Sequence, residues 1–174
     1  MIEIKNVNNV SEEIKMNLLE WRNSENVRKY FIHDDIITKE EHSLWIASVK
    51  KGDIKAYVVY YDDIAVGLVY LPKIFSKHKT AEIGLYIYDE RFKKKGIAQK
   101  AYEDLINMAF SQFGIEKLFC KIISTNVASV NLHKKIGFKE EGLLKKDIVK
   151  SDGLRHDVIL MGLLKDEHNL KKND

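Results

Sequence analysis

Cysteine and proline are almost absent from this chain. Cys120 is the only cysteine among 174 residues, which excludes an intrachain disulfide and a cysteine-rich metal site. It lies in the apolar run 118–123, so we predict a packed thiol of the core rather than a nucleophile. Pro72 is the only proline, and no low-complexity linker or internal repeat divides the sequence. The length suits one domain, which we expect over residues 1–166, followed by a polar tail over residues 167–174 that frays.

A strong net charge and a long hydrophobic run are also missing. The net charge of +3 is too small to argue for nucleic acid on its own. No apolar run approaches the length that spans a bilayer, and the N-terminus lacks the basic and apolar regions of a secretory signal. We therefore expect a cytoplasmic protein with no membrane partner. The six histidines are dispersed and form no His-x-x-x-His pair, so no metal is expected.

The hydrophobic periodicity predicts seven strands and five helices. A capping box of Thr38 and Glu41 marks the start of one helix, and Gly52 marks its end. The mixed order of these elements indicates an α/β (α+β) fold, with a mostly antiparallel central sheet and helices on both faces. The strands are expected over 2–7, 56–61, 64–75, 81–88, 118–124, 138–149 and 154–164, and the helices over 12–21, 25–31, 38–51, 96–112 and 128–136.

The stretch 81–109 carries the clearest functional signal. A short apolar strand leads into a cationic turn, and the small residues Gly96-Ile97-Ala98 open a long amphipathic helix. A helix N-terminus presents unpaired N–H groups and a partial positive charge. This unit is therefore suited to hold an anion such as a pyrophosphate.

Two sequence motifs then indicate a resemblance to one family of proteins. Lys93-x-x-Gly96-x-Ala98 resembles the Gln/Arg-x-x-Gly-x-Gly/Ala signature of the GCN5-related N-acetyltransferases (GNAT family), with lysine at the first position. The block from Asn126 to Phe138 is similar to the Asn-x-x-Ala/Ser-x-x-Leu-Tyr-x-x-x-Gly-Phe block of the same family. The resemblance covers nearly the whole chain. It implies the GNAT fold, whose central sheet is seven-stranded, mixed and mostly antiparallel.

The resemblance also implies transfer of an acetyl group from acetyl-CoA to a primary amine. The backbone N–H groups of 94–98 would cradle the CoA pyrophosphate, and the strand 83–88 would splay from 118–124 to admit the thioester. The Ile87 N–H would polarise the thioester carbonyl, and Asn126 would bind the pantetheine arm. Lys93 to Lys95 either neutralise phosphates or form a solvated surface. The residues implied for the cofactor are Ile87, Lys93, Lys94, Lys95, Gly96, Ile97, Ala98, Asn126 and Ser129.

Two residues are candidates for proton transfer. A primary amine has a pKa near ~10.4, so a base should accept its proton at neutral pH. Ala81-Glu82-Ile83 matches the segment that carries the catalytic glutamate of the family's histone-acetylating founder, which makes Glu82 the candidate base. The alternative for Glu82 is a solvent-facing carboxylate paired with a lysine. His133 stands where many relatives carry a tyrosine general acid, and its alternative is a helix residue near the cofactor.

The segment 21–46 bears on the acceptor amine. It is similar to the acetyltransferases of pseudaminic acid biosynthesis, which act on a UDP-linked 4-amino-4,6-dideoxy sugar. By that resemblance Arg22 and His42 contact the nucleotide, where the indole of Trp45 can also stack. The alternative is that Arg22 caps the first helix and Trp45 belongs to the core. Tyr86 alternates with Leu85 and Ile87 along its strand and is expected at the acetyl slot, with packing in the sheet as its alternative.

Other acceptors and another class of protein stay open. The acceptor could instead be a protein N-terminus or a polyamine. A polyamine site needs a carboxylate cluster, which Asp34, Asp35, Glu40 and Glu41 could supply. A non-catalytic CoA-binding domain is the alternative of a different class. Members of the family often dimerise, so a homodimer is a further expectation.

Overall fold

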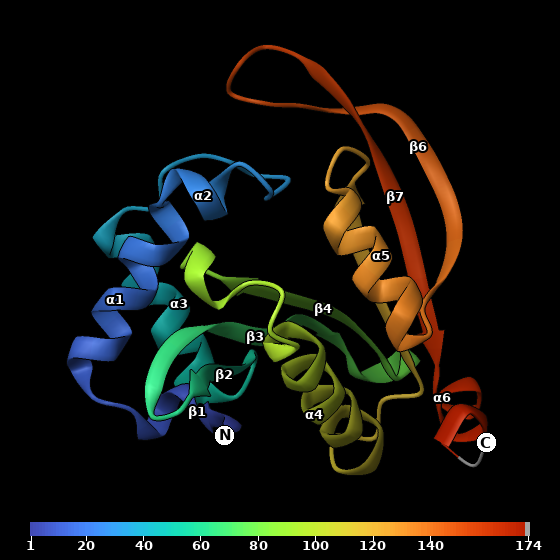
Figure 1. Ribbon diagram of the computed structural model, residues 1–174, viewed down its shortest axis with the longest axis horizontal. Coiled ribbons are helices and arrows are strands. Elements are labelled where there is room, and N and C mark those ends of the chain that lie inside the picture. The colour runs from blue at the N-terminus through green and yellow to red at the C-terminus, as the bar shows by residue number, and fades with distance from the viewer. Residues whose placement is uncertain (173–174) are drawn as a thin grey trace.

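Within the residues that the structure describes, seven strands form one sheet in the order β1-β2-β3-β4-β5-β7-β6 (Figure 1). The computed structural model describes residues 1–172. Every pair of neighbouring strands is antiparallel except β4 and β5, which run parallel. The predicted mixed, mostly antiparallel seven-stranded GNAT fold is thereby confirmed. The strands are β1 Ile2–Asn6, β2 Lys55–Tyr61, β3 Ile64–Phe75, β4 Thr80–Ile87, β5 Lys117–Ile123, β6 Lys139–Val149 and β7 Arg155–Leu164.

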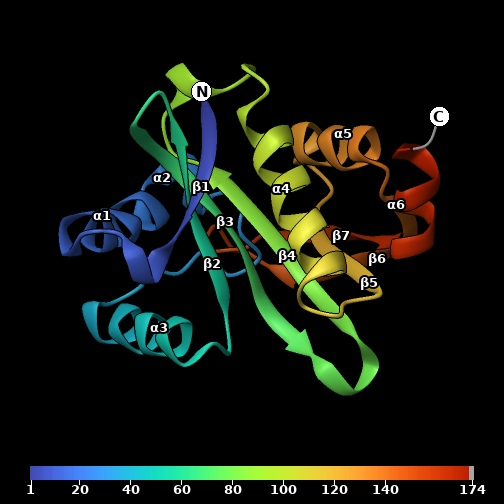
Figure 2. The same cartoon turned by 90° about the horizontal axis from the view of Figure 1, so that it is seen from below.

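Helices cover both faces of the sheet (Figure 2). Alternation along β2 explains why both faces need cover: Tyr57 and Val59 pack in the cluster with α4 and α5, whereas Ala56 and Val58 pack in the cluster with α1 and α3. The helices are α1 Glu12–Asn23, α2 Glu25–Arg28, α3 Lys39–Lys51, α4 Ile97–Ser111, α5 Val127–Ile136 and α6 Lys165–Lys172, with 3-10 turns η1 Val7–Asn9, η2 Ser76–His78 and η3 Glu90–Phe92.

The sheet opens between its two parallel strands. β4 and β5 pair only at Thr80–Lys117, Ala81–Leu118 and Glu82–Phe119. Beyond Glu82 the strands are no longer paired, as the family resemblance implies. This gap leaves backbone groups on the facing edges of both strands without a ladder partner.

Local capping explains where two helices begin and end. The predicted capping box is present: the Thr38 hydroxyl accepts from the Glu41 N–H, and the Glu41 carboxylate accepts from the Thr38 N–H. Gly52 ends α3 with a left-handed φ of 90°. In α5 the Asn126 side chain caps the start by accepting from the Ser129 N–H at 3.2 Å.

The structure corrects the expectation that the end of the chain frays. Residues 165–172 form α6, and His168 is buried against the ring of Phe110. Its Nε2 lies 3.0 Å from the Asn107 side-chain oxygen. The sequence of α6 shows no helical repeat of apolar residues, because a histidine and not an aliphatic side chain packs this helix against the rest of the domain. Residues 173–174 of the predicted tail lie outside the described part of the chain. The second predicted helix is also shorter, ending at Arg28.

Candidate active site

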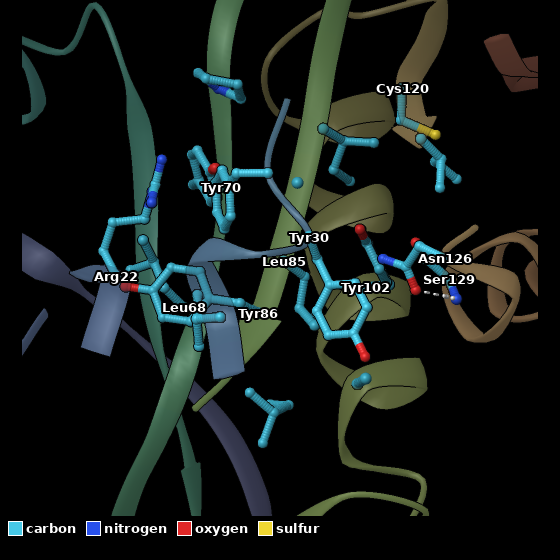
Figure 3. A pocket seen from close by; sticks show the side chains of 18 of the residues that line it. Arg22, Tyr30, Leu68, Tyr70, Leu85, Tyr86, Tyr102, Cys120, Asn126 and Ser129 are labelled. Atoms are coloured by element: carbon cyan, nitrogen blue, oxygen red, sulfur yellow. Dashed lines mark hydrogen bonds between the residues drawn. The ribbon is translucent and has the colours of Figure 1, made fainter. Parts of the chain in front are cut away.

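A cavity of about 1030 Å³ lies where β4 and β5 separate. Its walls come from 82–87 of β4, 120–122 of β5, the first turns of α4 and α5, and the segment after α2. Figure 3 shows Arg22 and Tyr86 on one side of this cavity, and Asn126 and Ser129 on the other. All of the predicted site residues except Lys95 line it. A single space therefore reaches both the predicted cofactor residues and the predicted acceptor residues.

Backbone geometry in β4 directs two N–H groups at the gap. The Tyr88 N–H donates to the Val66 oxygen, at 3.1 Å, on the β3 side. In an antiparallel ladder, successive N–H groups point to opposite sides of the strand. The regular register from Gly84 to Ile87 therefore turns the N–H groups of Leu85 and Ile87 away from β3 and toward β5. They face the cavity as unpaired donors, suited to polarise a carbonyl oxygen.

The N-terminus of α4 is open to an anion. Gly96 is the N-cap, with φ 75° and ψ −2°, and it gives the first turn no side-chain cap. A Cβ built at Gly96 would meet no atom within 4 Å, so the left-handed φ, and not crowding, favours glycine here. Gly96, Ile97 and Ala98 all line the cavity. The uncapped N–H groups and the helix dipole together form a site for a phosphate group.

The three lysines before Gly96 differ in their surroundings. Lys93 lines the cavity and forms an ion pair with Glu90, and Lys94 lines it with a left-handed φ of 59°. Lys95 lies outside the lining, and its ammonium sits 5.5 Å from the ring centroids of Tyr61 and Phe92. Lys93 and Lys94 are therefore better placed for a ligand in the cavity than Lys95.

Asn126 and Ser129 lie at the start of α5, beside the cavity. The side-chain oxygen Oδ1 of Asn126 caps the helix. The side-chain nitrogen Nδ2 is therefore the group that is left to donate a hydrogen bond. This arrangement fits a carbonyl oxygen on an extended ligand such as a pantetheine arm.

His133 is buried, with 1% of its surface exposed, between the rings of Tyr102 and Phe138. Its Nδ1 lies 2.8 Å from the Ser129 carbonyl oxygen, which can only accept, so Nδ1 carries the proton of the neutral ring. Burial lowers the pKa of His133 and favours this neutral form. Nε2 is then an unprotonated acceptor, and it has no hydrogen-bond partner among the described residues. This geometry argues against the predicted general-acid role.

Glu82 lies at the last paired position between β4 and β5. Its side chain is 22% exposed and lines the cavity, and its carboxylate is 3.9 Å from the Lys73 ammonium. Glu82 therefore pairs with a lysine, as one interpretation expects. Its carboxylate is also accessible to a ligand, as the interpretation of a base requires, because the ion pair is loose. A base needs that access to a substrate proton.

Arg22 does not cap the first helix. Its Nη2 donates to the His33 carbonyl oxygen at 2.7 Å, and its guanidinium lies 3.8 Å from the ring centroid of Phe31. Its Nη1 is buried and has no partner within residues 1–172. Burial lowers the pKa of Arg22, although a guanidinium stays charged at neutral pH. A buried donor without an acceptor is costly, so this nitrogen marks a place for a polar ligand atom.

The other acceptor residues are tied to α1. His42 Nε2 lies 2.8 Å from the Lys15 carbonyl oxygen, and burial lowers the pKa of His42. Trp45 stacks on His42 at 5.7 Å between centroids. The Tyr86 hydroxyl donates to the Leu18 carbonyl oxygen at 3.3 Å. These three side chains line the cavity while holding α1 and α3 in place.

The four acidic residues considered for a polyamine do not gather in the cavity. Among them only Glu41 lines it, and its carboxylate serves the capping box. Asp34 is directed to Ser151, where its carboxylate accepts the Ser151 hydroxyl at 2.7 Å. Within residues 1–172, the carboxylates of the lining are Glu41 and Glu82, whereas its lysine and arginine side chains are Arg22, Lys73, Lys93, Lys94, Lys121 and Lys135.

Several aromatic residues of the lining could not be identified from the sequence. Tyr30 and Phe31 lie after α2, at the end of the range 25–31 that the sequence predicts as a helix, and nothing in that pattern marks them as lining a cavity. Tyr70 packs its ring over Gly84, where a Cβ would come within 3.2 Å, and burial raises the pKa of Tyr70 to about 12. The only feature that points to Tyr70 is its pairing with Gly84 on the neighbouring strand. That pairing cannot be predicted from the sequence unless the register of the two strands is known. Cys120 is buried as predicted and also reaches the cavity.

Within residues 1–172, no group of three or more His, Cys, Asp or Glu side chains is arranged to hold a metal ion. No helix between residues 1 and 172 has the length and apolar character that crossing a membrane requires.

Comparisons with known proteins agree with this geometry. The family model described as Acetyltransferase (GNAT) domain matches residues 14–159. The chain is 27% identical over 135 residues to the uncharacterized N-acetyltransferase YnaD of Bacillus subtilis (strain 168), covering 76% of this chain and 78% of the relative. It is 33% identical over 107 residues to the putative ribosomal N-acetyltransferase YdaF of the same organism, covering 62% and 57%. Its fold matches the Vibrio cholerae spermidine N-acetyltransferase in complex with CoA and spermine, with a TM-score of 0.85, 20% identity and 97% and 98% coverage.

The chain belongs to the GNAT acetyltransferase family. It is an acetyl-CoA-dependent N-acetyltransferase, as the sequence predicts. The uncapped start of α4, the gap beside Ile87 and the free amide of Asn126 fit acetyl-CoA as cosubstrate.

Proposed function

We propose that this enzyme acetylates a small primary amine carried on an anionic molecule, such as a UDP-linked 4-amino-4,6-dideoxy sugar. The observation that carries this proposal is the buried, unpartnered Nη1 of Arg22 in the cavity wall. A guanidinium in this state favours a phosphate or carboxylate oxygen. The cationic side chains that line the cavity also favour an anionic acceptor, although some of them bind the phosphates of CoA.

Each step of the transfer has a candidate group in this chain. Bound acetyl-CoA supplies an activated acetyl group. The N–H groups at the start of α4 hold its pyrophosphate, and the Asn126 amide binds the pantetheine arm. The Ile87 N–H stabilises negative charge on the thioester oxygen as the amine attacks. Glu82 accepts the proton that the ammonium loses before it attacks. CoA leaves as a thiolate of low basicity, and the second proton, which the nitrogen loses after attack, goes to this thiolate or to solvent.

A second class of acceptor is favoured by the comparisons. The similar proteins named above include a spermidine acetyltransferase and a putative ribosomal acetyltransferase, whereas neither of them is named for an amino sugar. A polyamine or a protein N-terminus is therefore the second candidate. Glu41 and Glu82 are the carboxylates of the lining that could hold such a cationic acceptor. The cytoplasmic location and the homodimer stay predictions.

Thermal stability in the presence of candidate acceptors separates the two classes. We expect UDP or a UDP-4-amino sugar to raise the melting temperature of the enzyme, because a ligand that binds the folded state stabilises it. Spermidine should have no such effect. Replacing Arg22 by Gln should abolish the UDP shift while the shift caused by CoA persists. A shift with spermidine but none with UDP would instead support the polyamine.

A further inference from the structure

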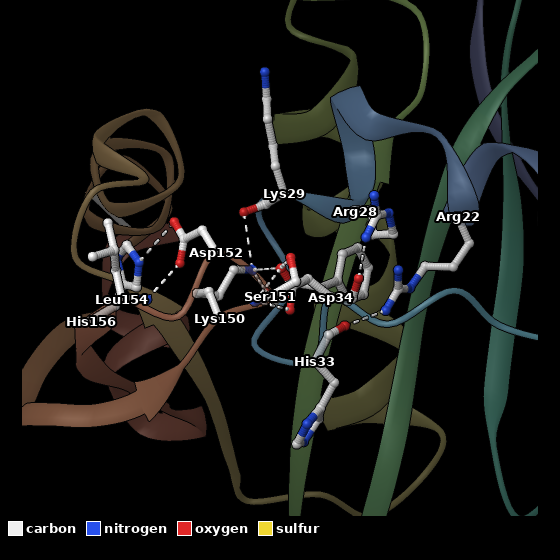
Figure 4. A network of polar contacts seen from close by, with 11 residues as sticks. Arg22, Arg28, Lys29, His33, Asp34, Lys150, Ser151, Asp152, Leu154 and His156 are labelled. Carbon is white, nitrogen blue, oxygen red and sulfur yellow. Dashed lines mark hydrogen bonds and ion pairs between the residues drawn. The ribbon is translucent and has the colours of Figure 1, made fainter.

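Two segments that are far apart in the sequence meet beside the acceptor end of the cavity. The turn at the tip of the β6–β7 hairpin contacts the segment that follows α2 (Figure 4). Lys150 is 8% exposed, and its ammonium donates to the carbonyl oxygens of Lys29, at 3.3 Å, and Phe31. The same ammonium lies 3.5 Å from the Asp34 carboxylate.

Asp34 completes this contact from the other side. It is 9% exposed, and its carboxylate accepts both the Ser151 N–H, at 3.2 Å, and the Ser151 hydroxyl, at 2.7 Å. These bonds, led by the hydroxyl, hold the pKa of Asp34 at about 2. We call the set of Asp34, Lys150, Ser151 and the two accepting carbonyls the Lys150 network. Its two buried charges satisfy each other, so removing one of them leaves the other uncompensated.

The segment that this network holds forms part of the cavity wall. Residues 30–33 all line the cavity. Within the described chain, no backbone–backbone hydrogen bond involves residues 32–36, so neither a helix nor the sheet fixes them. Side chains hold this segment instead: Arg22 donates to the His33 oxygen and Arg28 donates to the Asp34 oxygen. The position of the wall therefore depends on a few polar contacts.

The network also affects the charge at the acceptor end. The Asp34 carboxylate is turned toward Ser151 and Lys150, while its backbone oxygen takes the Arg28 guanidinium. Arg22 Nη1 and Arg28 Nε are both buried without a partner within residues 1–172. Burial lowers the pKa of Arg22, and Asp34 is near enough for its negative charge to act in the opposite direction.

We propose that Lys150 and Asp34 are positioning residues that set acceptor affinity and selectivity by holding residues 29–34 against the cavity. This rests on the proposed function only in taking that end of the cavity as the acceptor site. Buried ion pairs are weak evidence for stability alone, because desolvation of the two charges offsets their attraction. The contact links the outermost hairpin to a wall of the cavity, which is the arrangement a positioning role requires.

The test replaces Lys150 by Met, which keeps the buried stem and removes the charge. The matched control is Lys145→Met, since Lys145 is an exposed lysine of the same hairpin. In Lys150→Met, hydrogen exchange should become at least ~10-fold faster at the amides of residues 29–31 and 37, which donate hydrogen bonds, and stay unchanged in α4. With whichever amine the wild type acetylates, the acceptor KM should rise about 10-fold, which is about 1.4 kcal/mol. The KM for acetyl-CoA should stay within ~2-fold, because its site lies at the other helices.

A second variant guards against a simple loss of folding. In Asp34→Asn the amide oxygen can still accept from Ser151, so the segment should loosen less than in Lys150→Met. Combining both changes should cost less than the sum of the single effects, because the pair is removed together.

Three outcomes decide the proposal. Unchanged exchange at the amides of residues 29–31 and 37 of Lys150→Met would overturn it. Faster exchange with an unchanged acceptor KM, and with unchanged preference among amines, would reduce the network to a structural contact and also overturn it. If the wild type acetylates no amine, the proposed function fails. Hydrogen exchange and UDP binding in Lys150→Met then decide whether the Lys150 network positions the wall of the cavity.

Discussion

At the scale of single residues, Glu82 has the position that a base requires. Its carboxylate lines the cavity at the end of the β4–β5 pairing, and its ion pair with Lys73 is loose. We expect Glu82→Gln to lower kcat by about 10²- to 10⁴-fold near neutral pH, which is the usual contribution of a general base. The affinity for CoA should not change.

Steady-state kinetics across pH, with CoA titrations, checks this prediction. The lost activity should return as the pH approaches the pKa of the acceptor amine, because the amine then needs no base. Lys73→Met is the control, since it removes the ion pair and keeps the carboxylate. A wild-type rate in Glu82→Gln at every pH would remove Glu82 from the mechanism.

His133 leads to a prediction about stability rather than proton donation. Its buried ring is neutral in the folded state, and burial lowers its pKa. The unfolded chain takes up a proton near pH 6.5 whereas the folded chain does so only at lower pH. Stability is therefore complete above pH 6.5 and falls as the pH drops below that value, because the unfolded state then binds more protons.

His133→Phe should reduce this acid sensitivity. Urea unfolding at pH 7.5 and 5.5 measures the effect, and the difference between the two pH values should be smaller in the variant than in the wild type. The kcat of the variant at pH 7.5 should stay near the wild-type value, since Nε2 carries no proton to donate. A large, pH-dependent loss of kcat would restore His133 as an acid.

At the scale of elements, α4 offers a matched pair of glycines. Gly96 and Gly114 flank the helix with φ 75° and 68°, and an added Cβ would meet no atom within 4 Å at either position. Aspartate should strain both sites similarly, by about 1–2 kcal/mol. Only Gly96→Asp places a carboxylate at the positive end of the helix dipole, where we expect the pyrophosphate.

Calorimetric titration with CoA distinguishes the two positions. Gly96→Asp should weaken CoA binding at least ~10-fold, whereas Gly114→Asp should leave it unchanged. Gly96→Asn supplies nearly the same shape without the charge and should have a much smaller effect. Equal CoA affinity in all three variants would place the pyrophosphate elsewhere.

The elements that could be predicted from the sequence are those with local signals. The capping box at Thr38 and the closing Gly52 can be predicted because their partners lie within a few residues. The gap between β4 and β5 came from the family resemblance and not from periodicity. The α6 helix was missed because a buried histidine takes the place of an apolar stripe.

The acceptor wall was beyond prediction for a physical reason. Lys150 and Phe31 are 119 residues apart, and no local pattern marks either as part of one contact. The sequence suggested Asp34 as a ligand for a polyamine, whereas its carboxylate is satisfied by Ser151. Such long-range polar pairs depend on the final packing of the hairpin against the segment after α2.

At the scale of the whole molecule, the cavity joins two separate cores. One core lies between α1, α3 and the sheet, and the other lies between α4, α5 and the opposite face. Beyond three residue pairs, β4 and β5 diverge, and the cavity passes between them. A molecule bound at α4 and another bound beside Arg22 can thus meet at the edge of β4, where Ile87 and Glu82 lie.

Release of free CoA thiol from acetyl-CoA tests the central claim most directly. The purified protein should be incubated with acetyl-CoA and an amine panel that includes a UDP-4-amino sugar, spermidine and an N-terminal peptide. We predict thiol release that depends on enzyme and amine together, is largest for the anionic amino sugar and is strongly reduced in Glu82→Gln. Tight CoA binding without thiol release for any amine would contradict the account and leave a non-catalytic CoA-binding domain.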